Sequence, residues 1–276
     1  MALPAPVDHR PWPLPRSPWV MRMRWHRLLF MHWAIDPAAL RPLVPAPLEL
    51  DTLAGRAYLG VIPFTMSDVR PRLTPRLGRL SRFPELNVRT YVRVGDKPGV
   101  YFFSLDIPRR LPVHVARGVY RLAYYLAEMS VDVASDGEVR YQSRRLPTAP
   151  STHQRAETSD QKWRRPRMLR HLPHPVDPAA PAEFRATYRA TGAPAYPEPG
   201  TLAHFVTERY CLYTVTPGGR PLRGEIHHGP WPLQPAAAIL DAQTMTAPLG
   251  LSLPEAQPVL HYAHEMEVVA WPPMRT

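Results

Sequence analysis

Proline is the feature that most constrains how this chain can fold, because 37 of its 276 residues are proline. A proline inside a helix removes a backbone donor and costs about 3 kcal/mol, so long helices are disfavoured throughout the chain. Proline and glycine together make up only about 18 % of the residues, below the roughly 25–30 % at which low-complexity disorder is expected. The sequence therefore predicts a folded, strand-rich protein with short helices, and it excludes collagen and a disordered tail.

The apolar content and the cysteine count indicate a cytoplasmic globular protein. Hydrophobic residues make up 45 % of the chain, enough for a sizeable buried core. Cys211 is the single cysteine and can form no intramolecular disulfide. Residues 1–24 lack the apolar core of a signal peptide, and apolar runs such as Leu59–Phe64 are far shorter than the ~20 residues of a membrane span. We expect a cytoplasmic protein that does not enter a membrane.

The net charge of +11 comes almost entirely from arginine, since Lys97 and Lys162 are the only lysines among 34 basic residues. An excess of arginine, alanine and proline is what GC-rich coding produces without selection for a ligand. Nucleic-acid-binding proteins concentrate basic residues in one patch with aromatic residues between them, whereas here the charge is spread along strands and one loop. No nucleic-acid partner is expected unless the arginines of Leu146–Ala182 form one continuous patch.

Composition along the chain divides it into an arm and one domain. Residues 1–18 carry six prolines and no periodicity, which predicts an extended arm. Residues 19–276 are expected to form a single domain, because alternating segments occur on both sides of Leu146–Ala182. That stretch is rich in proline and arginine without any period, and it is interpreted as a basic loop insertion.

Several segments alternate in the way that strands do. In Glu85–Val94, Leu86 and every second residue after it share one face, while the other face carries polar groups. Residues 95–99 have turn chemistry and precede a second strand at Val100–Asp106, so the two strands form a hairpin. Further strands are expected at Gly55–Phe64, Glu138–Arg145, Glu183–Ala190, Thr207–Val215, Leu222–His228 and Val259–Trp271.

Helical periodicity is strongest in Pro112–Met129, where apolar residues recur at steps of three and four. A helix there puts Tyr120 and Tyr124 on one face. Asp36–Leu40 and Thr201–Val206 predict two much shorter helices.

The polar face of Glu85–Val94 admits two interpretations. On an open sheet with one wet side, it is the solvated face. In a closed barrel, the same side chains would line the interior and could recognise a small acid. The residues of this face are Glu85, Asn87, Arg89 and Tyr91. Glu208, Arg209 and Tyr210 leave the same two alternatives open.

Motifs for nucleotides, metals and covalent nucleophiles are absent from the sequence. Among the twelve histidines, His227 and His228 are adjacent on an expected strand and point to opposite faces, and His261 and His264 diverge in the same way. Cys211 has no base close by in the sequence and is interpreted as a core residue. We expect no metal centre and no cofactor.

Six separated blocks carry a family resemblance that spans about Trp19–Trp271. They are Trp25–Trp33, Val61–Phe64, Glu85–Val92, Gly99–Asp106, Thr207–Tyr213 and Ile226–Leu233. In these blocks the chain resembles an uncharacterised bacterial family of the acetoacetate-decarboxylase-like superfamily. The resemblance implies an α+β fold that is mainly antiparallel β, a closed barrel or cone around a central cavity with a few short helices.

The decarboxylases of this superfamily carry a Gly-Arg-Glu step followed by Pro-Lys-Lys, in which a lysine forms a Schiff base with a keto-acid. On this chain the pattern falls on residues 116–118 and 123–125, where Arg117 is kept and both lysine positions are tyrosine. Lys97 is expected in an exposed hairpin turn and Lys162 in the arginine-rich loop, where nothing lowers the pKa of an amine. Schiff-base decarboxylation is therefore not expected.

The remaining polar groups predict a small-molecule site. Glu85 and Tyr124 are the candidate catalytic acid–base residues, and the candidate ligand-binding residues are Asn87, Arg89, Tyr91, Arg117 and Tyr120. Arg89 or Arg117 is expected to pair with Glu85 when no ligand is bound. The expected partner is a small carboxylated or carbonyl compound. A non-catalytic binding or sensing protein is the alternative, and a homo-oligomer is compatible with either.

Overall fold

The computed structural model describes residues 3–75, 78–108, 122–146, 177 and 180–276. Its strands are β1 (Met21–Ile35), β2 (Glu49–Leu50), β3 (Ala57–Pro71), β4 (Phe83–Val94), β5 (Lys97–Ile107), β6 (Tyr124–Val133), β7 (Val139–Arg145), β8 (Glu183–Ala190), β9 (Cys211–Val215), β10 (Pro221–His227), β11 (Gln234–Gln243), β12 (Val259–Ala270) and β13 (Met274–Arg275). The helices are α1 (Pro37–Leu40) and α3 (Leu202–Thr207), with 3₁₀ turns at Arg41–Leu43, Gly78–Ser81 and Ala247–Leu249. Among the described helices, none has the length and apolar character that a membrane crossing requires.

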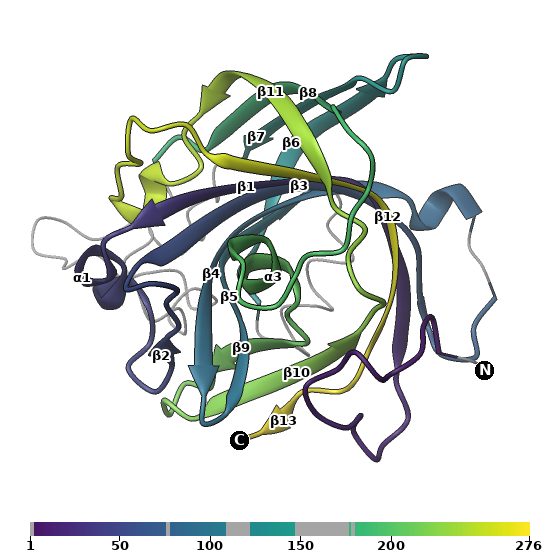
Figure 1. Ribbon diagram of the computed structural model, residues 1–276, viewed down its shortest axis with the longest axis vertical. Helices are drawn as coiled ribbons and strands as arrows, with labels where there is room; N and C mark the ends of the chain where they lie inside the picture. Colours follow the sequence, from purple (N-terminus) through teal and green to yellow (C-terminus); the bar gives the residue numbers. More distant parts are fainter. Residues whose placement is uncertain (1–2, 76–77, 109–121, 147–176, 178–179) are drawn as a thin grey trace, which may run out of the picture.

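The strands close into a nine-stranded mixed barrel. All of the pairings are antiparallel except β5 with β6 and β5 with β9. β1, β3, β4, β5 and β12 belong to this barrel and also to a second closed circuit, which β9 and β10 complete. We call this second circuit the α3 ring, because helix α3 lies at its centre (Figure 1). The mainly antiparallel barrel with few helices that the resemblance implied is confirmed.

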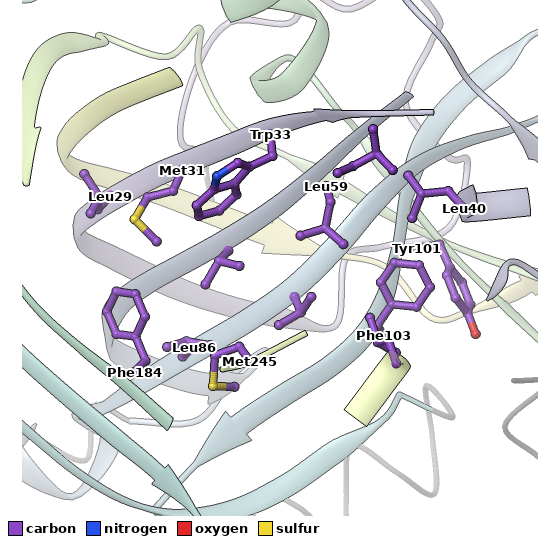
Figure 2. Close-up of a cluster of buried hydrophobic side chains, with 14 of the residues drawn as sticks. Leu29, Met31, Trp33, Leu40, Leu59, Leu86, Tyr101, Phe103, Phe184 and Met245 are labelled. Carbon is purple, nitrogen blue, oxygen red and sulfur yellow. The ribbon is translucent and has the colours of Figure 1, made fainter. Parts of the chain in front are cut away.

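The shared strands have hydrophobic side chains on both faces. On the barrel side, Leu29, Met31 and Trp33 of β1 pack with Leu59 of β3 and Leu86 of β4, and Phe184 of β8 closes over them (Figure 2). On the α3-ring side, Phe30, Ile62 and Phe64 form a second cluster with Trp231. The two clusters alternate along each strand, since neighbouring side chains of a strand point to opposite faces.

The segment expected to be the longest helix is a strand where the structure describes it. Tyr124–Val133 is β6, whose first three residues pair with β5 and whose remainder, from Ala127 to Val133, pairs with β7. Its first residues alternate between half-buried and buried, and Tyr125 and Ala127 are the buried ones. Pairing with two neighbouring strands outweighs the three- and four-residue spacing on which the helix prediction rested. Residues 112–121 of that prediction lie outside the described residues, as do nearly all of Leu146–Ala182.

Other boundaries differ in ways that the register explains. The strand expected at Gly55–Phe64 is β3, which runs past Phe64 and continues to Pro71. Pro63 lies opposite the irregular stretch of β1 between His26 and Met31, where Arg27 has a positive φ of 53°. The donor that proline lacks therefore falls where the ladder is already interrupted. β4, β7, β8, β9, β10 and β12 lie at the places the alternation predicted.

Candidate functional site

The polar face of β4 points into the α3 ring. Glu85 and Asn87 are only 3 % and 4 % exposed, Tyr91 is fully buried and Arg89 is half-buried. The solvated interpretation of this face is therefore wrong. The reason is that β4 belongs to two closed circuits, so most side chains on both of its faces are buried.

Glu85 is a neutral acid at pH 7. Burial, together with a smaller effect of the nearby Asp106 carboxyl, raises its pKa to about 8 against the opposing effect of a hydrogen bond from Tyr124. The Tyr124 hydroxyl donates to Glu85 Oε2 at 3.3 Å. From the barrel side, the Tyr141 hydroxyl donates to the backbone carbonyl of Glu85 at 2.8 Å and fixes this part of β4. The expected meeting of Glu85 with Tyr124 is present, although Tyr124 comes from a strand rather than a helix.

Tyr91 links β1 to helix α3. Its hydroxyl donates to the Val206 carbonyl at 2.9 Å and lies 2.6 Å from His32 Nε2. Because the tyrosine proton goes to Val206, His32 must donate from Nε2 and keep Nδ1 as an acceptor. Burial, and after it the Arg89 charge, holds the pKa of His32 well below its usual range, so the imidazole is neutral. The imidazole reaches Tyr91 only because Gly60, between them on β3, has no side chain.

Arg89 does not pair with Glu85, so this one of the two expected ion pairs is wrong, while the other, with Arg117, falls outside the described residues. Arg89 Nη2 donates to the Val206 carbonyl at 3.0 Å and its Nε to the Tyr91 hydroxyl at 3.3 Å. Its guanidinium carbon lies 5.6 Å from the centre of the Phe30 ring. A neutral Glu85 offers a weak partner for a cation, and backbone and phenol oxygens solvate Arg89 instead.

The other buried arginines near β4 have carboxylate partners. Arg209 Nη1 lies 2.6 Å from Asp51 Oδ2, and Arg145 Nη2 lies 2.7 Å from Asp106 Oδ1 on the barrel side. No carboxylate of the described residues pairs with Arg89. The inward face of β4 therefore carries one positive charge that the described part of the protein does not neutralise.

The remaining sequence candidates are only partly described. Arg117, Tyr120 and Lys162 lie outside the described residues. Lys97 does not occupy an exposed turn: the turn is Gly95 and Asp96, and Lys97 begins β5. Its Nζ lies 3.4 Å from Glu225 Oε1, on the face of β10 that points away from α3. No group of three or more potential metal-ligating side chains occurs in the described part of the chain.

Sequence reasoning missed two residues of this interior, His32 and Trp231. Trp231 is 2 % exposed, and its ring stands edge-on to Phe30 with the centres 5.0 Å apart. Both lie in the blocks that carry the family resemblance. That they meet the polar face of β4 depends on the closure of the α3 ring, which no local pattern reveals.

Comparisons with known proteins agree with this architecture. A model of the DUF2071 family, described as an uncharacterized conserved protein, matches residues 22–267. The uncharacterized protein YqjF of Bacillus subtilis (strain 168) is 38 % identical over 259 residues, which cover 94 % of this chain and 93 % of YqjF.

Two solved structures share the fold. Acetoacetate decarboxylase of Legionella pneumophila subsp. pneumophila str. Philadelphia 1 has a TM-score of 0.56 at 13 % identity, covering 98 % of this chain and 93 % of its own. The enduracididine biosynthesis enzyme MppR complexed with pyruvate has a TM-score of 0.54 at 9 % identity, covering 94 % of this chain and 91 % of its own. Identities this low show the fold alone. The match over residues 22–267 and the identity with YqjF establish that the chain belongs to the DUF2071 family, with an acetoacetate-decarboxylase-like fold.

Proposed function

We propose that this protein binds a small carboxylated or carbonyl compound inside the α3 ring, and that Glu85 and Tyr124 exchange a proton with it without a Schiff base. The observation that carries the proposal is the pairing of a neutral buried Glu85 with Tyr124 on the strand face that also holds Arg89. A carboxyl group with a pKa of about 8 can donate a proton near neutral pH and take it back.

Arg89 supports an anionic ligand. Its guanidinium has no carboxylate partner among the described residues, and its Nε and Nη2 donate only to a phenol and a carbonyl oxygen. A ligand carboxylate would neutralise this charge and could form two parallel hydrogen bonds with it. MppR, with which the chain shares its fold, is described in complex with pyruvate, a compound of this class.

The proposal is tested first by binding and then by proton exchange. Small oxo- and hydroxycarboxylic acids are titrated into the unaltered protein and into Arg89→Leu by calorimetry. The same acids are incubated with the protein in D₂O, and ¹H NMR follows the loss of signal at the carbon next to the carbonyl or carboxylate. We expect binding that Arg89→Leu abolishes, and exchange that Glu85→Gln abolishes and Tyr124→Phe slows at least tenfold.

The outcomes separate the two function classes. Binding without exchange would leave Arg89 as an anion site and favour the non-catalytic alternative over the acid–base role. Binding that is the same in Arg89→Leu would contradict the site itself. Incubation with acetoacetate and borohydride should leave the intact mass unchanged, and a stoichiometric adduct on Lys97 or Lys162 would contradict the absence of a Schiff base.

A further inference from the structure

Three buried polar atoms inside the α3 ring have no hydrogen-bond partner in the described part of the protein. They are His32 Nδ1, Asn87 Oδ1 and Trp231 Nε1, and their residues are 1 %, 4 % and 2 % exposed. A buried polar atom without a partner is costly, and native proteins keep few of them without a reason.

Two of these atoms belong to rings that contact Phe30, and the third belongs to a residue on the same sheet face. His32 stacks beside Phe30 with the ring centres 6.3 Å apart, and Trp231 meets its edge at 5.0 Å. The Arg89 guanidinium carbon lies 5.6 Å from the same ring centre. Asn87 pairs with Ile62, the β3 residue after Val61, while Phe30 precedes Met31, which pairs with Val61 in the antiparallel β1–β3 ladder. Asn87 therefore lies on the same sheet face, across one strand from Phe30.

Whether each atom is a hydrogen-bond donor or an acceptor determines which ligand group can pair with it. Trp231 Nε1 is a donor, and together with the Arg89 cation it suits a carboxylate. Asn87 Oδ1 is an acceptor. His32 Nδ1 is also an acceptor, because its Nε2 proton is used on Tyr91. Two acceptors call for two donors on the ligand, and neutral hydroxyl groups fit better than an ammonium group beside Arg89.

We infer that the ligand of this site is a hydroxycarboxylic acid, with its carboxylate on Arg89 and Trp231 and its hydroxyl groups on Asn87 and His32. The inference rests on the proposed function and narrows its ligand class. An oxo acid has no donor where the site offers two acceptors, so it would leave both unsatisfied.

A series of three-carbon acids tests the inference, because its members share the carboxylate and differ only in the oxo and hydroxyl groups on the other two carbons. Propionate has neither hydroxyl nor oxo group, pyruvate adds an acceptor, lactate adds one hydroxyl and glycerate adds two. Calorimetric titration of the unaltered protein should give dissociation constants that fall about tenfold from propionate to lactate and again about tenfold from lactate to glycerate, with pyruvate no tighter than propionate.

Two variants test whether the preference for hydroxy acids depends on Asn87. Asn87→Leu removes one acceptor and should reduce the ratio of the propionate dissociation constant to the glycerate dissociation constant at least tenfold. Ser104→Ala is the control, because Ser104 is equally buried but pairs with Val88 on the barrel side of the sheet, and it should leave all ratios unchanged. The four-acid comparison on the unaltered protein does not depend on how well Asn87→Leu folds.

The result that overturns the inference differs from the result that overturns the proposed function. Pyruvate or propionate binding as tightly as glycerate, or a preference for glycerate that persists in Asn87→Leu, would contradict the hydroxy-acid assignment while Arg89-dependent binding stands. No binding of any of the four acids, or binding that Arg89→Leu does not weaken, would overturn the proposed function and the inference with it.

Discussion

Glu85 and Arg89 lie on one strand face, four residues apart, but they do not form the ion pair that a carboxylate and a guanidinium usually form. Burial keeps the carboxyl of Glu85 protonated at pH 7, while the guanidinium of Arg89 donates hydrogen bonds to oxygens of Tyr91 and Val206. An ion pair between them would leave no free charge for a ligand. The proposed function depends on this separation, because it uses Glu85 as the proton donor and Arg89 as the anion site.

The protonation of Glu85 makes stability depend on pH. Its pKa rises from an ordinary 4.5 in the unfolded chain to about 8 in the folded protein, so folding binds a proton between these values. Its contribution to the free energy of unfolding is complete below pH 4.5 and is lost as pH rises through 8. The difference in unfolding free energy between the unaltered protein and Glu85→Gln should fall by up to ~5 kcal/mol over that range. Urea denaturation at several pH values measures it, and a difference that rises with pH would contradict the sign.

Gly60 controls the position of His32. A Cβ at Gly60 would lie 2.9 Å from His32 Nε2, so Gly60→Ala should displace the imidazole and break its hydrogen bond with Tyr91. We expect a loss of about 1–3 kcal/mol in the free energy of unfolding, as for other overpacked interiors. Gly218→Ala is the matched control, because a Cβ there comes no closer to another residue than 4.0 Å. Equal stability of the two variants would contradict the close approach.

The N-terminal arm is part of the folded structure rather than a free extension. Arg10 donates to the Ile226 carbonyl at 2.6 Å and to Glu225 Oε2 at 3.2 Å, and the Trp12 indole donates to the same oxygen. Lys97 and Arg223 reach the other oxygen of Glu225. The arm thus supplies one of three cations that surround a buried carboxylate.

Arg10→Leu should therefore destabilise the protein. The side chain of Arg10 is 1 % exposed and that of Glu225 is 3 % exposed. Because Glu225 keeps two other cations, we expect the free energy of unfolding to fall by about 1–3 kcal/mol, which is less than the cost of breaking an isolated buried ion pair. Arg16→Leu is the control, because Arg16 lies on the same arm and is exposed. Chemical denaturation of both variants decides the matter, and no difference between them would show that the arm does not contribute.

The elements that the sequence predicts well are those whose side chains alternate without interruption. β4 and β8 lie where the alternation put them, because one strand face differs in chemistry from the other. β6 was mistaken for a helix, and β1 and β11 were not anticipated, because long-range pairing rather than local pattern decides their structure. The site divides in the same way. Glu85 follows from the polar stripe, whereas His32 and Trp231 join it only through ring closure.

At the scale of the whole molecule, five strands belong to both the barrel and the α3 ring. β12, β1, β3, β4 and β5 present mostly hydrophobic side chains to the barrel, whereas toward the α3 ring they present a second hydrophobic cluster together with the polar face of β4. Strands before residue 146 pair directly with strands after residue 182, as β7 does with β8 and β1 with β12. The chain is therefore predicted to behave as one folding unit.

Cleavage between those halves tests this prediction. A specific protease site placed within residues 147–176 should allow the chain to be cut while the two fragments stay together, because β7–β8 and β1–β12 pairing holds them. Size-exclusion chromatography should show one species of the uncut size. Two fragments that separate and each remain folded would contradict the single domain.

The central claim is that Glu85 is a buried acid beside an anion site, and its own titration tests this most directly. ¹³C NMR of glutamate side chains, with Glu85→Gln to assign the signal, gives the pKa of Glu85 in the free protein and with saturating lactate or glycerate. We predict a pKa of about 8 without ligand and a higher value with it, because a second negative charge nearby disfavours the carboxylate. A pKa near the ordinary 4.5, or one that the ligand leaves unchanged, would contradict the account.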